Sequence, residues 1–189
     1  MVRRIAHIRR SGLLAAALVA IAACGPPPST TASTVVHSDC GTDGPYRETI
    51  ASKATPTPAA AGGGLFFELG VRRLQIDVGP IREARYTFPI PVGVGRVVGV
   101  SFNDANPNTW SVRGSELLIT FKGPNGGWLV NDFPRFTIIV LLAPTLRAGD
   151  TVRWQPYRRF EQEFVSVERP LACTVRDPAQ VLQTVTVRA

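Results

Sequence analysis

The chain has few of the side chains on which most hydrolases and metalloproteins depend. Of its 189 residues, two are histidine and one is methionine, and both Met1 and His7 lie in the first ten positions. His37 is therefore the single histidine after the N-terminal segment, and no serine stands in a G-x-S-x-G pattern. A serine or cysteine nucleophile needs an adjacent base, most often histidine. The sequence thus argues against a catalytic triad, and we interpret His37 as an exposed residue.

An excess of positive charge is also lacking once the N-terminus is set aside. The formal net charge is +7, but four of the 21 basic residues lie in the first ten positions and all 14 acidic residues follow Cys24. From Cys24 onward the balance is only +3. A nucleic-acid-binding domain usually carries a much stronger basic patch. We therefore expect no nucleic-acid partner.

Two patterns typical of metal sites have incomplete ligand sets. Residues 149–154, GDTVRW, resemble the strand GDTVxW of cupredoxins, a family that holds copper with two histidines, a cysteine and usually a methionine. Asp104, Asn106 and Asn108 have the spacing of a calcium loop, but the twelfth position is Ser115 instead of glutamate. We expect a polar turn at these three residues, with a weak cation site as the alternative. No metal and no cofactor is expected.

The first 24 residues have the pattern of an export signal. Arg3, Arg4, Arg9 and Arg10 precede an apolar run at residues 13–23, which is too short to span a bilayer as a helix. The run ends in Ile-Ala-Ala-Cys at residues 21–24 and resembles the lipobox of bacterial lipoprotein precursors. That resemblance implies cleavage after residue 23 and a diacylglyceryl group on the thiol of Cys24.

The lipobox also implies a location. Two or three acyl chains hold a soluble domain firmly on a membrane, so we expect a cell-membrane protein, lipid-anchored on the extracytoplasmic side. The alternatives are ordinary secretion with an incidental cysteine, and an uncleaved anchor. Arg9 and Arg10 leave the twin-arginine route open beside the general secretory route, which Gly12 favours because twin-arginine signals prefer a bulky apolar residue there.

The cysteine count agrees with an exported lipoprotein. The three cysteines are Cys24, Cys40 and Cys173. If Cys24 carries lipid, Cys40 and Cys173 remain as a pair in a compartment where disulfides persist. We predict a disulfide between them; two free buried thiols are the alternative.

The remaining pattern predicts an all-β fold. Short runs alternate apolar and polar residues, as at residues 98–102 and 116–122, and residues 136–142 form a continuous apolar run of strand length. Gly, Pro, Asn and Asp separate the runs, and no long window has helical periodicity. About eight to ten strands at this spacing predict an antiparallel immunoglobulin-like β-sandwich.

Composition suggests where the signal peptide, the tether and the folded domain begin and end. Residues 1–23 are the predicted signal peptide. Residues 24–64 are rich in proline, alanine, threonine and glycine, and we predict a lipidated, flexible tether or arm there. The β-sandwich domain is predicted over residues 65–189.

Two groups of residues are candidates for a functional site. Arginine and aromatic residues alternate at residues 153–160, and we predict a binding surface for an envelope protein or a glycan. Its candidate residues are Trp154, Tyr157, Arg158 and Arg159. In the alternative interpretation Trp154 enters the core and arginine stems cover its rim. Glu161 and Glu163 share one face of a strand, a spacing that a glycan hydrolase could use.

Three classes of function follow. We predict a membrane-tethered, non-catalytic binding or interaction module of the cell envelope. A carrier of lipid or another small ligand would need a hollow between the sheets. An enzyme would depend on Glu161 and Glu163, and a flat, exposed face around them would remove its support.

Overall fold

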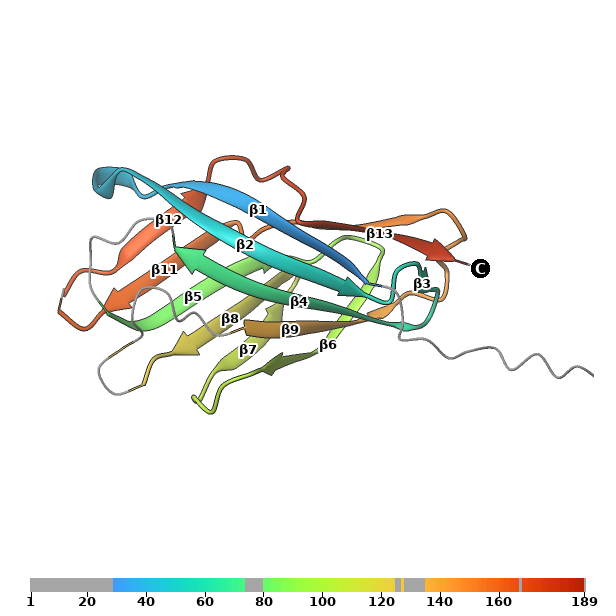
Figure 1. The fold of residues 1–189 in the computed structure, drawn as a ribbon, viewed down its shortest axis with the longest axis horizontal. Helices are drawn as coiled ribbons and strands as arrows, with labels where there is room; N and C mark the ends of the chain where they lie inside the picture. Colours follow the sequence, from blue (N-terminus) through green and yellow to red (C-terminus); the bar gives the residue numbers. More distant parts are fainter. Residues whose placement is uncertain (1–28, 74–79, 125–126, 128–134, 167, 189) are drawn as a thin grey trace, which may run out of the picture.

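The computed structural model describes residues 29–73, 80–124, 127, 135–166 and 168–188 (Figure 1). The predicted signal peptide and the predicted lipid attachment at Cys24 lie outside these residues.

The described residues form thirteen strands and one short 3-10 helix. In chain order the elements are β1 (Thr30–Asp39), η1 (Gly41–Asp43), β2 (Pro45–Thr55), β3 (Ala59–Ala60), β4 (Gly64–Arg73), β5 (Ile81–Pro89), β6 (Gly95–Phe102), β7 (Thr109–Arg113), β8 (Glu116–Lys122), β9 (Arg135–Leu142), β10 (Thr151–Trp154), β11 (Arg159–Phe164), β12 (Leu171–Val175) and β13 (Gln183–Arg188).

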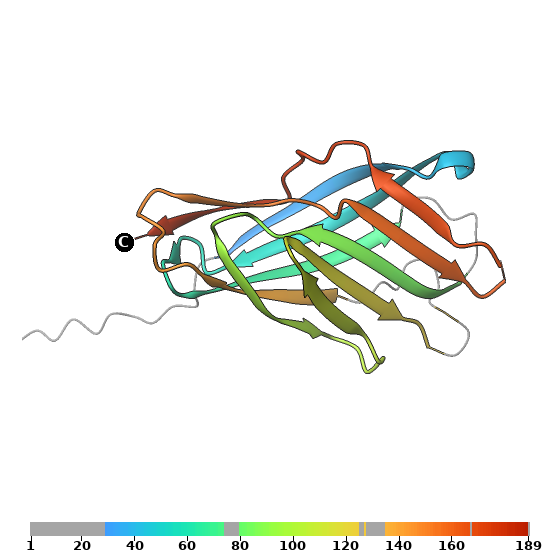
Figure 2. The same ribbon diagram turned by 180° about the vertical axis from the view of Figure 1, so that it is seen from behind.

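Ten of these strands form a sheet that folds into two layers. The strand order is β6-β9-β4-β2-β1-β12-β11-β5-β8-β7. β1 pairs with β2 over its whole length but with β12 at only two residue pairs, Ser38↔Val175 and Asp39↔Thr174. The sheet bends at this short junction, so β6-β9-β4-β2-β1 form a first layer (Figure 1) and β12-β11-β5-β8-β7 a second layer (Figure 2). A small sheet, β10-β13-β3, lies at the end where the chain terminates.

Alternating side chains explain how each strand divides between core and surface. In β8, Leu117, Ile119 and Phe121 are buried, while the residues between them are half-buried. β9 follows the same alternation, with Phe136 and Ile138 inside. Successive side chains of a strand point to opposite faces, so each layer turns one apolar face toward the other layer.

Aromatic side chains fill the space between the layers. The largest fully buried side chains include Trp154, Tyr86, Tyr157, Phe67, Phe88, Phe121, Phe136 and Phe160. The rings of Tyr86 and Phe160 stack with centroids 5.6 Å apart, and those of Phe121 and Phe136 lie at 5.2 Å. Such contacts are typical of a close-packed protein interior. The filled core counts against a carrier with a hollow between its sheets.

The predicted fold class is confirmed: the chain folds as an antiparallel β-sandwich. The predicted domain boundary differs from the structure, because β1 and β2 already form the inner part of the first layer before Leu65. Val36 and Ile50 in these strands are fully buried. Residues 30–55, predicted as part of a flexible arm, thus belong to the sandwich, and their strands raise the number above the eight to ten expected.

The predicted disulfide is also present. Cys40 directly follows β1 and Cys173 lies in β12, with a Cα–Cα distance of 4.1 Å and 133 residues between them in sequence. The bond therefore links the two layers next to the two-pair junction of β1 and β12.

Candidate binding surface

The four residues of the predicted binding surface separate into two buried and two exposed positions. Trp154 is 1% exposed and Tyr157 is fully buried, whereas Arg158 and Arg159 are exposed. The ring of Trp154 stacks on Phe67 with centroids 4.8 Å apart. The prediction that both aromatic side chains lie on a surface is wrong, because β10 turns Trp154 inward. The alternative, with Trp154 in the core, is correct.

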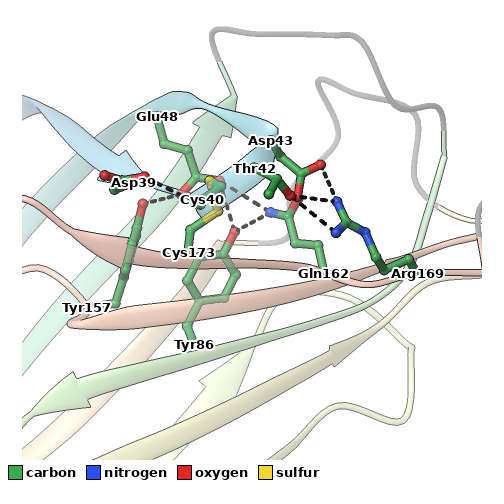
Figure 3. The surroundings of a disulfide bond; sticks show 11 residues. Asp39, Cys40, Thr42, Asp43, Glu48, Tyr86, Tyr157, Gln162, Arg169 and Cys173 are labelled. Atoms are coloured by element: carbon green, nitrogen blue, oxygen red, sulfur yellow. Dashed lines mark hydrogen bonds and ion pairs between the residues drawn. A yellow bond between two sulfur atoms is a disulfide. The ribbon is translucent and has the colours of Figure 1, made fainter.

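Tyr157 belongs to a buried polar cluster around Glu48 of β2. Glu48 is fully buried. The hydroxyl of Tyr157 donates a hydrogen bond to Oε2 of Glu48, and that of Tyr86 donates to Oε1 at 3.1 Å. Nε2 of Gln162 donates to Oε1 of Glu48 at 3.4 Å and to the hydroxyl oxygen of Tyr86 at 3.1 Å. Strands of both layers thus meet at this carboxyl group (Figure 3).

The surroundings keep both phenols protonated. Burial, followed by the nearby carboxyl group of Glu48, raises the pKa of Tyr86 and Tyr157 well above the ordinary value of 10.0. Both tyrosines therefore remain hydrogen-bond donors to Glu48 over the physiological pH range. Buried polar groups are stable only when such partners are present.

The disulfide and an ion pair lie beside this cluster. Figure 3 shows Cys40 and Cys173 next to Glu48 and Tyr86. Nearby, Nη2 of Arg169, in the link between β11 and β12, contacts the carboxylate of Asp43 in η1 at 2.5 Å. This contact joins η1 to the β11–β12 link at the surface, while the disulfide joins Cys40, just before η1, to β12 in the interior.

The Glu48 cluster is an internal brace. Glu48, Tyr86, Tyr157 and Gln162 are each fully buried, so a substrate cannot reach them without opening the core. Sequence analysis missed Glu48, although one signal was available. In β2 it has the same phase as Tyr46 and Ile50, both of which point inward.

The outer face of the second layer carries charges of both signs. We call it the mixed-charge face. Among the described residues that have a register partner in a neighbouring strand of this layer, the outward charged ones are Glu83, Arg85, Arg113, Glu116, Lys122, Arg159, Glu161 and Glu163. Four are basic and four are acidic, and threonine, serine, alanine and leucine residues stand between them.

Arg85 is the centre of this face. Its Nε donates a hydrogen bond to Glu83 at 2.6 Å, and its guanidinium lies 3.5 Å from Glu161 and 3.2 Å from Glu163. The hydrogen bond to Glu83 raises the pKa of Arg85, as do the charges of all three carboxylates. Lys122 adds a contact to Glu83 at 3.4 Å.

This arrangement removes the support for a glycan hydrolase. Glu161 and Glu163 share a strand face as predicted, but both pair with the same guanidinium and their side chains are 51% and 41% exposed. A glycosidase needs one carboxyl with a raised pKa to act as the acid. Here both carboxyl groups instead form ion pairs with Arg85 at exposed positions, so neither is set apart as a proton donor to a sugar.

A shallow hollow lies next to Arg85 on the mixed-charge face. Its volume is about 220 Å³, and it is lined by Arg85, Thr87, Leu118, Arg159, Phe160 and Glu161. Arg159 lies across it: Nε donates to Oγ1 of Thr87 at 3.4 Å, and Nη2 lies 3.7 Å from Glu116. The predicted surface residue Arg159 thus forms part of a surface hollow, although without its predicted aromatic partners.

The remaining candidates from the sequence lie in a polar turn and on an exposed strand position. The side-chain amides of Asn106 and Asn108 donate hydrogen bonds to Asp104, so the predicted polar turn is present. His37 is exposed on β1. In the part of the chain that the structure describes, no three His, Cys, Asp or Glu side chains are placed to hold a metal ion. Within the same residues, no helix is long and apolar enough to span a membrane.

Comparison with known proteins gives likeness of shape only. No family model matches the chain, and no curated protein matches it. Among solved structures, a cohesin module from a Clostridium perfringens family 33 glycoside hydrolase matches with 11% identity over 85% of this chain and 98% of that one, at a TM-score of 0.48. A cohesin from Archaeoglobus fulgidus matches with 12% identity over 69% and 85%, at 0.42.

A third solved structure is a putative membrane anchored protein from Corynebacterium diphtheriae. It matches with 15% identity over 85% of this chain and 37% of that one, at a TM-score of 0.38. At these scores we base no functional assignment on any of the three.

Proposed function

We propose that the chain is a lipid-anchored, extracytoplasmic, non-catalytic module that binds a partner protein through the mixed-charge face. The observation that carries this proposal is the hollow at Arg159 and Leu118, set in a sheet face with interspersed acidic and basic side chains. Such a pattern favours a partner with complementary charges and disfavours others.

Several features favour a protein over a glycan. Flat glycan-binding faces stack sugars on exposed aromatic rings, but Trp154, Tyr157 and Phe160 are buried. Trp110 of β7 is 38% exposed, but it pairs with the inward Ile119 and so does not belong to the mixed-charge face. The face offers arginine, which is enriched in protein interfaces. Leu118 is half-buried in the hollow and provides an apolar centre.

The first test concerns the lipid anchor. We expect mass spectrometry of the membrane-extracted protein to show a mature chain that begins at Cys24 and carries a diacylglyceryl group. In Cys24→Ala the acylation should be lost and the precursor should retain residues 1–23, because the thiol is the attachment point. A wild-type chain without acyl groups would contradict the anchor.

The second test concerns the partner. We expect Arg159→Glu combined with Leu118→Asp to reduce capture of an envelope protein at least tenfold, because central arginine and apolar contacts dominate interface energies. The measurement is a saturation binding assay with the captured protein, after it has been identified by mass spectrometry.

The matched control is Arg153→Glu combined with Thr151→Asp, which makes the same change in net charge at two exposed positions of β10. Capture should be unchanged in this variant. Capture that survives the double substitution would place the interface elsewhere, and retention of a glycan instead of a protein would contradict a protein partner.

A further inference from the structure

The outer face of the first layer is predominantly basic. Alternation and strand register place five exposed basic side chains on it, and we call it the basic face. These residues are Arg47, Lys53, Arg72, Arg96 and Arg135. Among the residues that the structure describes, two acidic ones share this face: Glu68, whose side chain lies 3.9 Å from Arg135, and Asp39 at one end.

The two faces of the sandwich therefore differ in charge. The mixed-charge face has as many acidic as basic side chains, whereas five basic side chains stand against two acidic ones on the basic face. The basic face is also the side that Figure 1 presents and the mixed-charge face the side that Figure 2 presents.

The basic face carries small residues at its centre. Ala51 pairs with Gly70, and Gly70 pairs with Arg135, so small residues of two neighbouring strands lie side by side. They leave a shallow hollow of about 320 Å³ whose charged lining residues are Lys53, Arg135 and Glu68. Small central residues allow this face to approach a flat, negatively charged surface closely.

Apolar side chains are exposed on the same face. Phe66 is 43% exposed and Val35 is 41% exposed. Phe66 pairs with Ile139, which is half-buried on this face. Basic residues interspersed with exposed phenylalanine and aliphatic residues are typical of protein surfaces that lie in a lipid headgroup region.

The N-terminal connection leads to this face. Residues 25–29 separate Cys24 from β1, which begins at Thr30. The six chain steps can reach at most roughly 20 Å, at about 3.6 Å each. Thr31, the next residue, lines the central hollow of the basic face. An acyl anchor at Cys24 would therefore keep this face close to the bilayer.

We propose that the basic face lies against the membrane and binds the headgroups of anionic phospholipids. This proposal rests on the lipid anchor of the proposed function, and it leaves the mixed-charge face directed away from the bilayer toward the partner. Anionic lipids attract basic side chains within about a Debye length of the surface. The basic face would then orient the domain on the membrane, and the mixed-charge face would bind the partner.

The experiment measures binding of residues 25–189, without acyl chains, to vesicles. This segment contains every described strand and both disulfide cysteines. We expect sedimentation with vesicles of equal parts phosphatidylglycerol and phosphatidylcholine, weakening as salt is raised, and none with phosphatidylcholine alone. The triple variant Lys53→Glu, Arg72→Glu, Arg135→Glu should bind the anionic vesicles at least tenfold more weakly.

The matched control is Arg147→Glu, Arg153→Glu, Arg176→Glu, which makes the same change in net charge at exposed positions outside the basic face. Its binding should change less than threefold. An equal loss in both triple variants, or equal binding to neutral vesicles, would overturn the proposal. Binding to a soluble polyanion such as polyphosphate, without binding to vesicles, would overturn it as well.

The outcome is independent of acylation. The vesicle assay uses a chain without lipid, so its failure would contradict headgroup binding by the basic face. The lipid anchor would be unaffected, because it is tested separately by the mass of the mature N-terminus. Conversely, an unacylated Cys24 would contradict the anchor without changing the vesicle result.

Discussion

Replacement of Glu48 by alanine is expected to lower the free energy of unfolding by about 3–5 kcal/mol. The substitution removes the acceptor of hydrogen bonds from Tyr86, Tyr157 and Gln162, all of which are fully buried. A buried donor left without a partner costs about 1–3 kcal/mol, and the vacated volume adds a cavity cost. Urea-induced unfolding, followed by tryptophan fluorescence, measures the change.

Glu68→Ala is the control for this prediction. Glu68 lies on the outer face of β4 with a side chain that is 46% exposed, and its contact to Arg135 is 3.9 Å long. An exposed ion pair contributes little, so we expect a loss below about 1 kcal/mol. If both alanine variants lose the same small amount, the Glu48 cluster does not brace the two layers.

Removal of the disulfide is expected to have an effect of similar size. Cys40→Ala with Cys173→Ala opens a loop of 133 residues, and the chain-entropy model gives about 5 kcal/mol for a loop of this length. The effect arises mainly in the unfolded chain, which gains freedom when the link is absent. Equilibrium unfolding of the oxidised wild type and the double variant measures it.

A reducing agent provides the control for the disulfide. It should lower the stability of the wild type toward that of the double variant and leave the double variant unchanged. A wild type that is equally stable with and without reductant, after complete reduction has been verified by thiol labelling, would contradict a stabilising role for the bond.

The sequence indicated the strands well where apolar and polar residues alternate clearly. β8 and β9 correspond to residues 116–122 and 136–142, which have strong alternation or a continuous apolar run. β1 and β2 were missed because several of their inward residues are small or polar. Ser52, for example, is buried and receives a hydrogen bond from Gln183 at 3.0 Å. Such a residue looks like part of a tether until its partner in β13 is known.

The candidate site was predicted only in part, for a related reason. Composition identified an arginine and aromatic segment, but only the phase of the strands decides which side chains are exposed. Tyr157 precedes β11 and points to Glu48, whereas Arg159 begins β11 and lies on the outer face. The basic face escaped detection because its residues are far apart in sequence and are brought together by strand pairing.

The position of the disulfide also determines how the domain would respond to mechanical force. A pull on the N-terminal segment reaches the sandwich at Thr30 and opens the β1–β2 ladder from its first pair, Thr30↔Ala54, one pair at a time. The opening stops after Asp39, because the next residue is Cys40 and its covalent bond transfers the load to β12. A pull on the tether can therefore draw out β1, after which the load bypasses residues 41–172, the loop that the disulfide closes. The strands from β2 to β11 lie within this loop and are shielded from the force.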